Sequence, residues 1–270
     1  MGKVGFIGSG VMGGAIIKGV VKTGYLKAPD IAVYDIATEK VRELVNETGI
    51  DASPDIERLC KECGYIFICV KPIFIDDVLT ETSRYITRDA VVVSIAAGVT
   101  IKRIKSHFSD DVDVIRTMPN TPLIIGEGMT VICSEGVKDR QKADFVTGIF
   151  ASMGRTQELP ENLMSEVISL TGSSPAYAYM LIGAMAKAAI EMGIPENVSY
   201  KMGAQAVLGA ARMVLETDAK PEKLISDVCS KGGATIEAVN KLMDKGFDEI
   251  IKEAMKACVR KAYELGGEVK

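Results

Sequence analysis

A short apolar strand runs directly into a glycine-rich turn near the start of this chain. Residues 4–14 read Val-Gly-Phe-Ile-Gly-Ser-Gly-Val-Met-Gly-Gly, and a helical pattern of apolar residues follows. In this context Gly8 permits the tight turn, Gly10 lets the backbone approach a pyrophosphate, and Gly13 lets helix and strand pack closely. The N–H groups at the helix start would face the phosphates. The pattern therefore predicts a Rossmann-type dinucleotide-binding unit, although glycine turns also serve purely structural roles.

Apolar segments alternate with helical patterns through the first 160 residues, which is typical of a parallel sheet. Most of these segments are continuously apolar, as expected for strands that are covered on both faces. They predict an α/β fold in which residues 1–160 form a doubly wound, mostly parallel sheet. The expected strands are 4–7, 31–34, 65–70, 91–95, 112–116 and 129–133, with a further short one near 156–159.

The periodicity becomes helical after Pro160, so residues 161–270 are expected to form an all-helical second domain. Pro195 and Pro221 are suited to helix starts, whereas Gly193, Gly246 and the Gly266-Gly267 pair are suited to helix ends. The stretch 174–192 is apolar on nearly every face, and such a helix must be buried. A domain of this size has limited room to bury it alone, so we expect it to pack in a homo-oligomer.

The charge and hydropathy of the chain exclude several classes of partner. A net charge of −4 over 270 residues argues against nucleic acid as the main partner. No apolar stretch is long enough to span a membrane, and no signal peptide precedes the first strand. We therefore expect a cytoplasmic protein.

The histidine and cysteine content excludes further kinds of chemistry. His107 is the single histidine and lies in a polar stretch, where we expect it to be solvated. This excludes a histidine–carboxylate dehydrogenase mechanism and a multi-histidine metal site. Cys60 and Cys63 form a Cys-x-x-Cys pair, but no second pair or nearby histidine completes a zinc site. We expect reduced thiols and no bound metal.

Ligands of open α/β sheets bind beyond the carboxyl ends of the strands. Asp35 ends the second strand about 20 residues after Gly13, the spacing of an acid that accepts hydrogen bonds from an adenosine ribose. A carboxylate there would repel a 2′-phosphate and favour NAD over NADP. Alternatively, Asp35 is an ordinary helix N-cap or turn residue.

The next strand ends also carry residues suited to a ligand. Small residues in the segment 96–98 would let the backbone approach a cofactor, and prolines after the strands would stiffen the loops. The alternative is that these are ordinary strand exits, which use glycine and proline anyway. The strand ends concerned are Val70, Lys71 and Pro72, then Ala96, Ala97 and Gly98, and then the segment 116–122, which includes Asn120.

Taken together, these motifs resemble the pyrroline-5-carboxylate reductase family over nearly the whole chain. The first half contributes the opening glycine turn, Val-Lys-Pro at 70–72, Ser-Ile-Ala-Ala-Gly-Val-Thr at 94–100 and Arg-x-Met-Pro-Asn-Thr-Pro at 116–122. More specific matches lie in the helical half: Thr-Gly-Ser-Ser-Pro-Ala-Tyr at 171–177, Gly-Ala-Gln-Ala-Val-Leu-Gly-Ala-Ala at 203–211 and Gly-Gly-Ala-Thr-Ile-Glu-Ala at 232–238.

The resemblance implies that NAD(P)H reduces the cyclic imine Δ1-pyrroline-5-carboxylate to L-proline, the final step of proline biosynthesis. It also implies an N-terminal Rossmann domain and an all-helical C-terminal dimerisation domain. Such a homodimer could assemble further into a ring such as a decamer. Carried over residue by residue, the resemblance implies that the cofactor is lined by the strand ends named above and by Ile7, Gly8, Ser9, Gly10, Val11 and Met12, with Gly13 beside them.

The resemblance implies that the substrate binds a loop in the helical half. Backbone N–H groups of Ser230, Gly232 and Gly233 would hold its carboxylate, and Thr235 would hydrogen-bond the ring nitrogen as the catalytic group. A helix start suits carboxylate binding, although an ordinary threonine-capped loop is the alternative. Thr171 and Ser173 could bound the same pocket.

The chain departs from the family pattern at three positions. Lys231 stands where many members have proline, Ile56 where some have an asparagine near the adenosine ribose, and Asp35 where many have serine or threonine. The last two put NADP preference in doubt. Two other functions stay open: a β-hydroxyacid dehydrogenase, which typically needs a lysine soon after Gly172 although none precedes Lys187, and a non-catalytic dinucleotide-binding protein.

Overall fold

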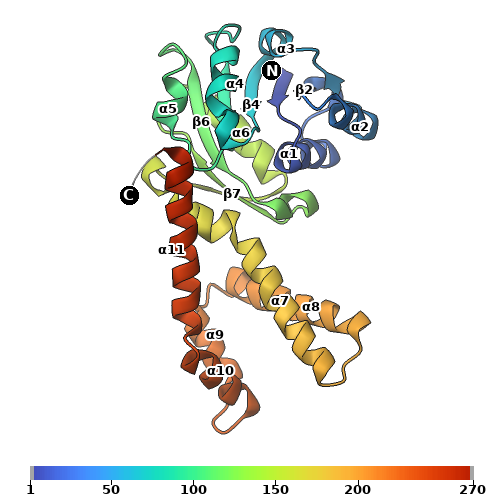
Figure 1. The fold of residues 1–270 in the computed structure, drawn as a ribbon, viewed down its shortest axis with the longest axis vertical. Helices are drawn as coiled ribbons and strands as arrows, with labels where there is room; N and C mark the ends of the chain where they lie inside the picture. The colour runs from blue at the N-terminus through green and yellow to red at the C-terminus, as the bar shows by residue number, and fades with distance from the viewer. Residues whose placement is uncertain (1–2, 268–270) are drawn as a thin grey trace. The chain divides into compact units, whose positions relative to one another are not determined.

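The structure, a computed structural model, describes residues 3–267 of the chain (Figure 1). By its contacts the chain forms two compact units. The first takes the residues up to Ser173 together with those from Cys258 onward, and the second is Ser174–Ala257. The last helix therefore begins in the second unit and ends in the first.

An eight-stranded sheet forms the centre of the first unit, in the order β3-β2-β1-β4-β5-β6-β7-β8. All neighbouring strands are parallel except β6 and β7, which are antiparallel. This confirms the predicted α/β fold with a mostly parallel, doubly wound sheet. The strands are β1 Lys3–Ile7, β2 Ile31–Tyr34, β3 Asp51–Ala52, β4 Cys63–Ile68, β5 Val91–Ser94, β6 Asp113–Met118, β7 Gly128–Cys133 and β8 Gly154–Glu158.

One strand was not predicted from the sequence, and the antiparallel pairing was not anticipated either. Strand β3 has only two residues, both exposed, so it carries no apolar pattern. It exists because its backbone pairs with the edge of β2. The direction of β7 depends on its pairing with β6, which the hydropathy of either strand does not encode.

Helices cover both faces of the sheet, and each face has its own apolar core. Successive side chains of a strand point to opposite faces, so Ile66 and Ile68 of β4 belong to one core cluster and Phe67 to the other. The helices of this unit are α1 Val11–Lys22, α2 Thr38–Thr48, α3 Ile56–Glu62, α4 Ile75–Thr82, α5 Ile101–Lys105 and α6 Arg140–Ala151.

The Cys-x-x-Cys pair lies where α3 meets β4, inside one of these cores. Cys60 and Cys63 are both buried free cysteines. Burial raises the pKa of each thiol to about 12, so both stay protonated near neutral pH. Among the described residues no group of histidines, cysteines and acids could hold a metal ion.

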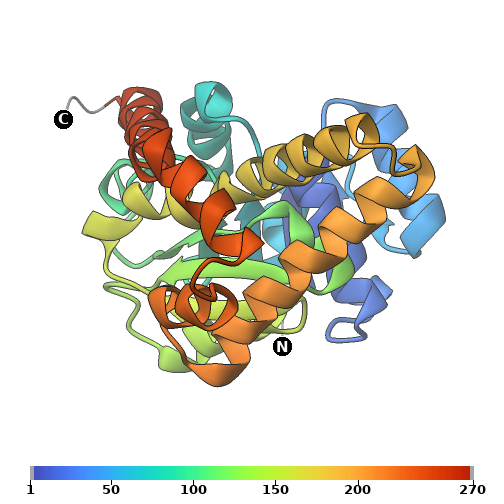
Figure 2. The same cartoon turned by 90° about the horizontal axis from the view of Figure 1, so that it is seen from below.

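The second half is helical, as predicted. Pro195 is the N-cap of α8 and Pro221 is the first residue of α9, while Gly193 and Gly246 have positive φ angles at the helix ends. The helices are α7 Ser174–Glu191, α8 Glu196–Thr217, α9 Pro221–Val228, α10 Ala234–Asp244 and α11 Phe247–Gly266. Helices α7 and α8 pack against each other as a hairpin (Figure 2).

Residues 161–173 connect the two halves of the sequence. A domain boundary near residue 160 stays a prediction, and it differs from the division of contacts given above. Met164, Val167 and Ile168 belong to a core cluster of the sheet-containing unit. Apolar burial therefore ties this short segment to the sheet, although its helical character continues into α7.

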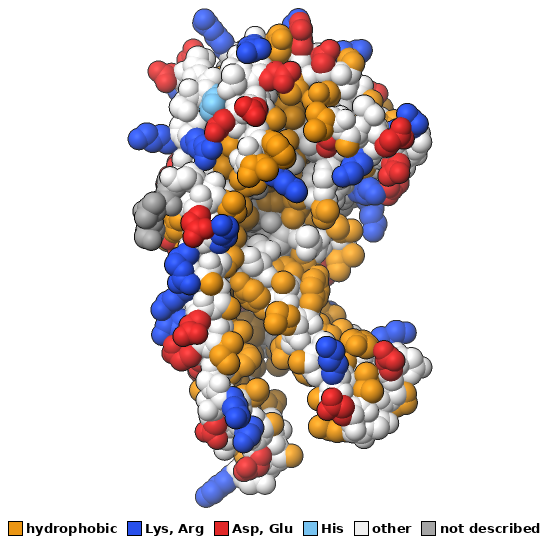
Figure 3. Space-filling model, in the orientation of Figure 1, with side chains coloured by type: hydrophobic (Ala, Val, Ile, Leu, Met, Phe, Trp, Pro, Cys, Tyr) orange, Lys and Arg blue, Asp and Glu red, His pale blue; other side chains and the backbone are white. Residues whose placement is uncertain are grey.

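The helices of the second unit bury little of their apolar surface within one chain. Of the described residues of α7, only Ala186 is buried, while Tyr179 and Met180 are 62% and 74% exposed. Figure 3 shows hydrophobic side chains gathered over α7 and α8. A single chain therefore does not bury α7, although its apolar sequence predicts a buried helix. In the described part of the chain, no helix is long and apolar enough to cross a membrane.

Candidate active site

The glycine turn joins β1 to α1 at the carboxyl edge of the sheet. Gly8 has a φ of +105°, and a Cβ there would lie 2.7 Å from the carbonyl oxygen of Cys69. A Cβ on Gly13 would lie 2.3 Å from the carbonyl oxygen of Gly8. By contrast, a Cβ on Gly10 would meet nothing within 4 Å. Gly8 and Gly13 are therefore required by the fold, and open space beside Gly10 leaves room for a ligand.

The start of α1 offers its backbone to that space. Gly10 is the N-cap residue and makes no side-chain cap hydrogen bond. Val11, the first helical residue, is 80% exposed. An uncapped helix N-terminus presents N–H groups and a positive dipole end, which suits an anionic group such as a pyrophosphate.

Asp35 holds the glycine turn from the neighbouring strand end. Its Oδ2 accepts hydrogen bonds from the backbone N–H and the hydroxyl of Ser9, at 2.6 and 2.9 Å, and its Oδ1 accepts one from Ala37 N at 2.9 Å. Partial burial alone would raise the pKa of this carboxyl, but the hydrogen bonds outweigh it and lower the pKa. Asp35 is therefore an ionised group, and it also caps the local turn as the alternative interpretation proposed.

Two open cavities lie beside Asp35 and Ser9. One of about 340 Å³ is lined by Asp35, Thr38, Arg42 and Ser53 among others. The other, of about 440 Å³, is lined by Ser9, Gly10, Lys18, Lys40 and neighbouring residues. Both contain polar and charged groups beside the glycine turn, so the region has space and chemistry for the adenosine and phosphate parts of a dinucleotide. Ile56, another of the three departures from the family pattern, is a core residue and is not among the residues that line either cavity.

The other predicted cofactor residues follow β4 and β5 at the same sheet edge. Cys69 N donates to the carbonyl of Ile7 at 2.8 Å, which brings the Val70–Pro72 exit beside the glycine turn. Strand β5 pairs with β4, so the segment Ala96–Gly98 lies next along the edge. Lys71 is exposed there. The sheet therefore brings these chain segments together at one edge, as their positions at strand ends predicted.

Asn120 joins the sheet edge to the segment expected to bound the substrate. Its Nδ2 donates to the carbonyl of Thr171 at 3.0 Å, and its Oδ1 accepts from Met129 N at 2.9 Å. Both ends of its side-chain amide thus have hydrogen-bond partners within the protein. Any contact with a cofactor would use the remaining hydrogen-bonding capacity of this amide or the backbone. Thr171 lies in a π-helical turn, Ile168–Gly172, and such turns occur frequently at functional sites.

A buried arginine that is not among the predicted site residues contacts the segment 161–173, which also contains Thr171. Arg116 lies within β6, after Val114 and Ile115, and is 1% exposed. Its Nη1 lies 3.5 Å from Glu161 Oε1 and its Nη2 lies 3.4 Å from Ser165 Oγ. The same Glu161 oxygen accepts from the backbone N–H of Ile101, the first residue of α5. The sequence signal for this network is a charged residue directly after the apolar residues Val114 and Ile115.

The predicted substrate loop lies in the second unit, before α10. Gly232 has a φ of +72°, and Gly233 N donates to the carbonyl of Ser230 at 3.0 Å. Gly233 is the N-cap of α10 and makes no side-chain cap hydrogen bond, so the first N–H groups of this helix remain available. Thr235 and Lys231 are both exposed beside them. The loop therefore combines an anion-binding helix start with a hydroxyl and a cation.

Comparison with known proteins gives a consistent result across the chain. Residues 161–265 match the family model for pyrroline-5-carboxylate reductase dimerisation, and residues 3–98 match the model for NADP oxidoreductase, coenzyme F420-dependent. The Escherichia coli pyrroline-5-carboxylate reductase is 40% identical over 263 residues, covering 97% of this chain and 98% of that protein. The human pyrroline-5-carboxylate reductase 2 is 35% identical over 267 residues, covering 96% and 82%.

Solved structures agree with these relatives. The pyrroline carboxylate reductase of Plasmodium falciparum with NADP bound superposes with a TM-score of 0.90 at 26% identity, covering 98% of both chains. The Coxiella burnetii pyrroline-5-carboxylate reductase superposes with a TM-score of 0.88 at 28% identity, also covering 98% of both. With near-complete coverage and identities above 30% among its relatives, this chain belongs to the pyrroline-5-carboxylate reductase family.

Proposed function

We propose that this protein reduces Δ1-pyrroline-5-carboxylate to L-proline with NAD(P)H, the final step of proline biosynthesis. One observation carries this proposal: the Escherichia coli reductase is 40% identical over 263 residues, which cover 97% of this chain and 98% of that protein. The imine carbon gains a hydride, the ring nitrogen gains a proton, and NAD(P)H becomes NAD(P)⁺.

The cofactor half of the proposed site is built by residues of the first unit. Gly10 leaves space at the uncapped start of α1, and this start suits a pyrophosphate. The strand exits Val70–Pro72 and Ala96–Gly98 would line the nicotinamide half. When bound, NAD(P)H supplies the hydride that the substrate receives.

The substrate half of the proposed site is the loop before α10. The N–H groups of the first helical residues after Gly233 would bind the substrate carboxylate, with Lys231 adding positive charge. The Thr235 hydroxyl would donate a hydrogen bond to the ring nitrogen and orient the imine. A pyrroline nitrogen can take much of its proton from water, so positioning is the main task of the protein and no histidine is required.

We propose NADH as the preferred cofactor. The ionised Asp35 lines the cavity of about 340 Å³ beside the glycine turn. A 2′-phosphate placed there would meet a carboxylate of the same charge, whereas a ribose diol could donate hydrogen bonds to it. Arg42 lines the same cavity and would soften this repulsion, so the preference is expected to be moderate.

We propose a homodimer formed through the helical domain, which could extend to a ring such as a decamer. The family model that matches residues 161–265 is a dimerisation model. The exposed apolar side chains of α7 and α8 would be buried by a second copy. Light scattering should give at least twice the 28.9 kDa of one chain at micromolar concentration, and a monomer would refute this. A cytoplasmic location likewise stays a prediction.

Steady-state kinetics with NADH and NADPH side by side tests the proposed reaction. Loss of the near-ultraviolet absorbance of reduced nicotinamide, dependent on fresh pyrroline-5-carboxylate and matched by proline formation, is the expected result. Activity with 3-hydroxyisobutyrate and none with pyrroline-5-carboxylate would favour a β-hydroxyacid dehydrogenase. Dinucleotide binding without turnover of either substrate would favour a non-catalytic binding protein.

A further inference from the structure

We infer that the last turn of helix α11 is a positioning element for the loop Ala96–Gly98. It sets the backbone of this loop through a contact between two glycines, and Arg103 locks the contact in place. The inference rests on the proposed function to the extent that Ala96–Gly98 lines the dinucleotide. The supporting residues, Gly266 and Arg103, have no role of their own in the proposed site.

The contact is closer than any side chain would allow. A Cβ on Gly98 would lie 2.2 Å from the carbonyl oxygen of Ala262 and 2.9 Å from Gly266 N. Conversely, a Cβ on Gly266 would lie 2.1 Å from the carbonyl oxygen of Gly98. Real Cβ atoms essentially never approach other atoms within 3.0 Å. Neither glycine can therefore gain a methyl group unless backbone moves.

The sequence predicts that a small residue at position 98 lets the backbone approach a cofactor. The structure shows instead that glycine is needed there because α11 packs against it. The space that a Cβ of Gly98 would need is occupied by α11, with no gap left for a ligand on that side. Its φ of +78° is a second requirement for glycine. Helix α11 thus supports the loop from behind, and a ligand would have to approach it from another side.

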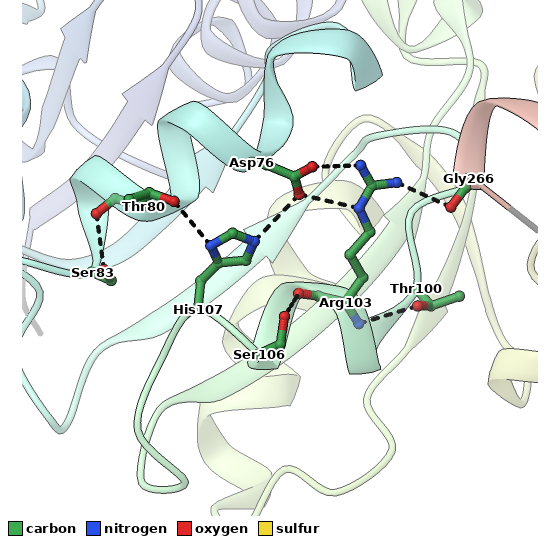
Figure 4. A network of polar contacts seen from close by, with 8 residues as sticks. All are labelled: Asp76, Thr80, Ser83, Thr100, Arg103, Ser106, His107 and Gly266. Carbon is green, nitrogen blue, oxygen red and sulfur yellow. Dashed lines mark hydrogen bonds and ion pairs between the residues drawn. The ribbon is translucent and has the colours of Figure 1, made fainter.

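A single guanidinium locks this arrangement (Figure 4). Arg103 Nη1 donates to the carbonyl of Gly266 at 3.0 Å, at the end of α11. Its Nε and Nη2 donate to the two carboxylate oxygens of Asp76, at 3.1 and 2.6 Å. His107 Nε2 lies 3.3 Å from Asp76 Oδ1, and Thr80 Oγ1 lies 3.1 Å from His107 Nδ1. The planar fork of arginine makes these bonds at once, which a lysine cannot do.

The hydrogen bonds of Arg103 connect α4, α5 and α11, the three helices next to the proposed cofactor loops. Asp76 lies in the first turn of α4, just after the Val70–Pro72 exit, and Arg103 lies in α5, just after Ala96–Gly98. The loop residues are two alanines and a glycine, which have no polar side chains to hold themselves in position. Their position therefore depends on what packs against them, and α11 is that support.

The test is the binding of NADH and NADPH to the full-length Gly266→Ala variant. The added methyl should push the Gly98 carbonyl away and raise the Kd of the preferred dinucleotide about tenfold. At saturating dinucleotide kcat should change by less than about twofold. Glu264→Ala is the matched control, because Glu264 lies exposed in the same turn of α11 and its side chain pairs with the exposed Lys261. Its Kd should equal that of the unchanged protein.

Arg103→Lys provides a second test at a partly exposed position, where the variant is expected to fold. Since lysine can contact either Asp76 or the Gly266 carbonyl, Kd should rise about threefold, between the control and Gly266→Ala. Folded variants with unchanged Kd would overturn the inference, and so would a lower kcat with unchanged Kd. If the unchanged protein binds dinucleotide but does not reduce pyrroline-5-carboxylate, the proposed function fails while the Kd values still decide this inference.

Discussion

The carboxylate of Asp35 accepts two hydrogen bonds from Ser9, one from its backbone N–H at 2.6 Å and one from its hydroxyl at 2.9 Å. This pair connects the end of β2 to the glycine turn after β1. The turn role that the sequence offered as one alternative is therefore present, and the role beside an adenosine ribose stays a prediction. Asp35 shapes the turn, and it places a negative charge beside the cavity proposed for the adenosine ribose.

Replacing Asp35 should change cofactor preference in a way that separates these two roles. Asp35→Asn keeps an oxygen acceptor for the Ser9 N–H but removes the charge, so kcat/KM with NADPH relative to NADH should rise about tenfold. Asp35→Ser should also shift preference toward NADPH, but the weaker hold on the turn should raise KM for both cofactors. An unchanged protein that already strongly prefers NADPH would contradict our interpretation of this carboxylate.

Substituting Thr235 tests the proposed donor to the ring nitrogen. Thr235→Val has nearly the same shape but no hydroxyl, and turnover should fall about tenfold or more, as expected when one positioned donor is lost. Thr235→Ser retains the hydroxyl and should keep most of the activity. Stopped-flow measurement of the chemical step distinguishes the two variants. Equal rates in both would remove the role assigned to this residue.

Asn120 should matter for stability and for substrate binding together. Asn120→Ala leaves the N–H of Met129 and the carbonyl of Thr171 without their partner, so the free energy of unfolding should fall by about 1–3 kcal/mol. KM for pyrroline-5-carboxylate should rise as well, because the Ile168–Gly172 turn loses an anchor. Asn46→Ala, at an exposed position of α2, is the matched control. Denaturant unfolding that gives the same loss in both variants would argue against this anchor.

The Arg103–Asp76 pair should make stability depend on pH in the acid range. The hydrogen bonds from Arg103 lower the pKa of the Asp76 carboxyl below its ordinary value. A lowered folded-state pKa means that the pair stabilises the protein fully above the ordinary carboxyl pKa of about 4 and loses this effect as pH falls through the lowered value. The difference in Tm between the unchanged protein and Asp76→Asn should therefore be greatest near neutral pH and shrink in acid. A constant difference would contradict this.

The elements of this fold were largely predictable from local sequence. Ile31–Tyr34 forms a strand with the predicted bounds, and Pro221 and Gly266 mark helix ends where proline and glycine predicted them. These features depend on residues a few positions apart, through periodicity, capping and the φ preferences of glycine and proline. Family membership followed from motifs of the same kind. The strand ends expected near a cofactor also lie along one edge of the sheet, because parallel strands end together.

Contacts between residues distant in sequence were decided only by the tertiary structure. Nothing in the segment 94–100 indicates that Gly98 packs against Gly266, or that Asn120 uses its amide on Thr171. The lone His107, expected to be solvated, instead lies 3.3 Å from Asp76 with 19% of its side chain exposed. The physical reason is that a side chain meets its partner through the packing of whole elements, which local propensity does not encode. The sequence by itself thus determined the elements and the kind of ligand, whereas tertiary packing decided what each residue at the sheet edge contacts.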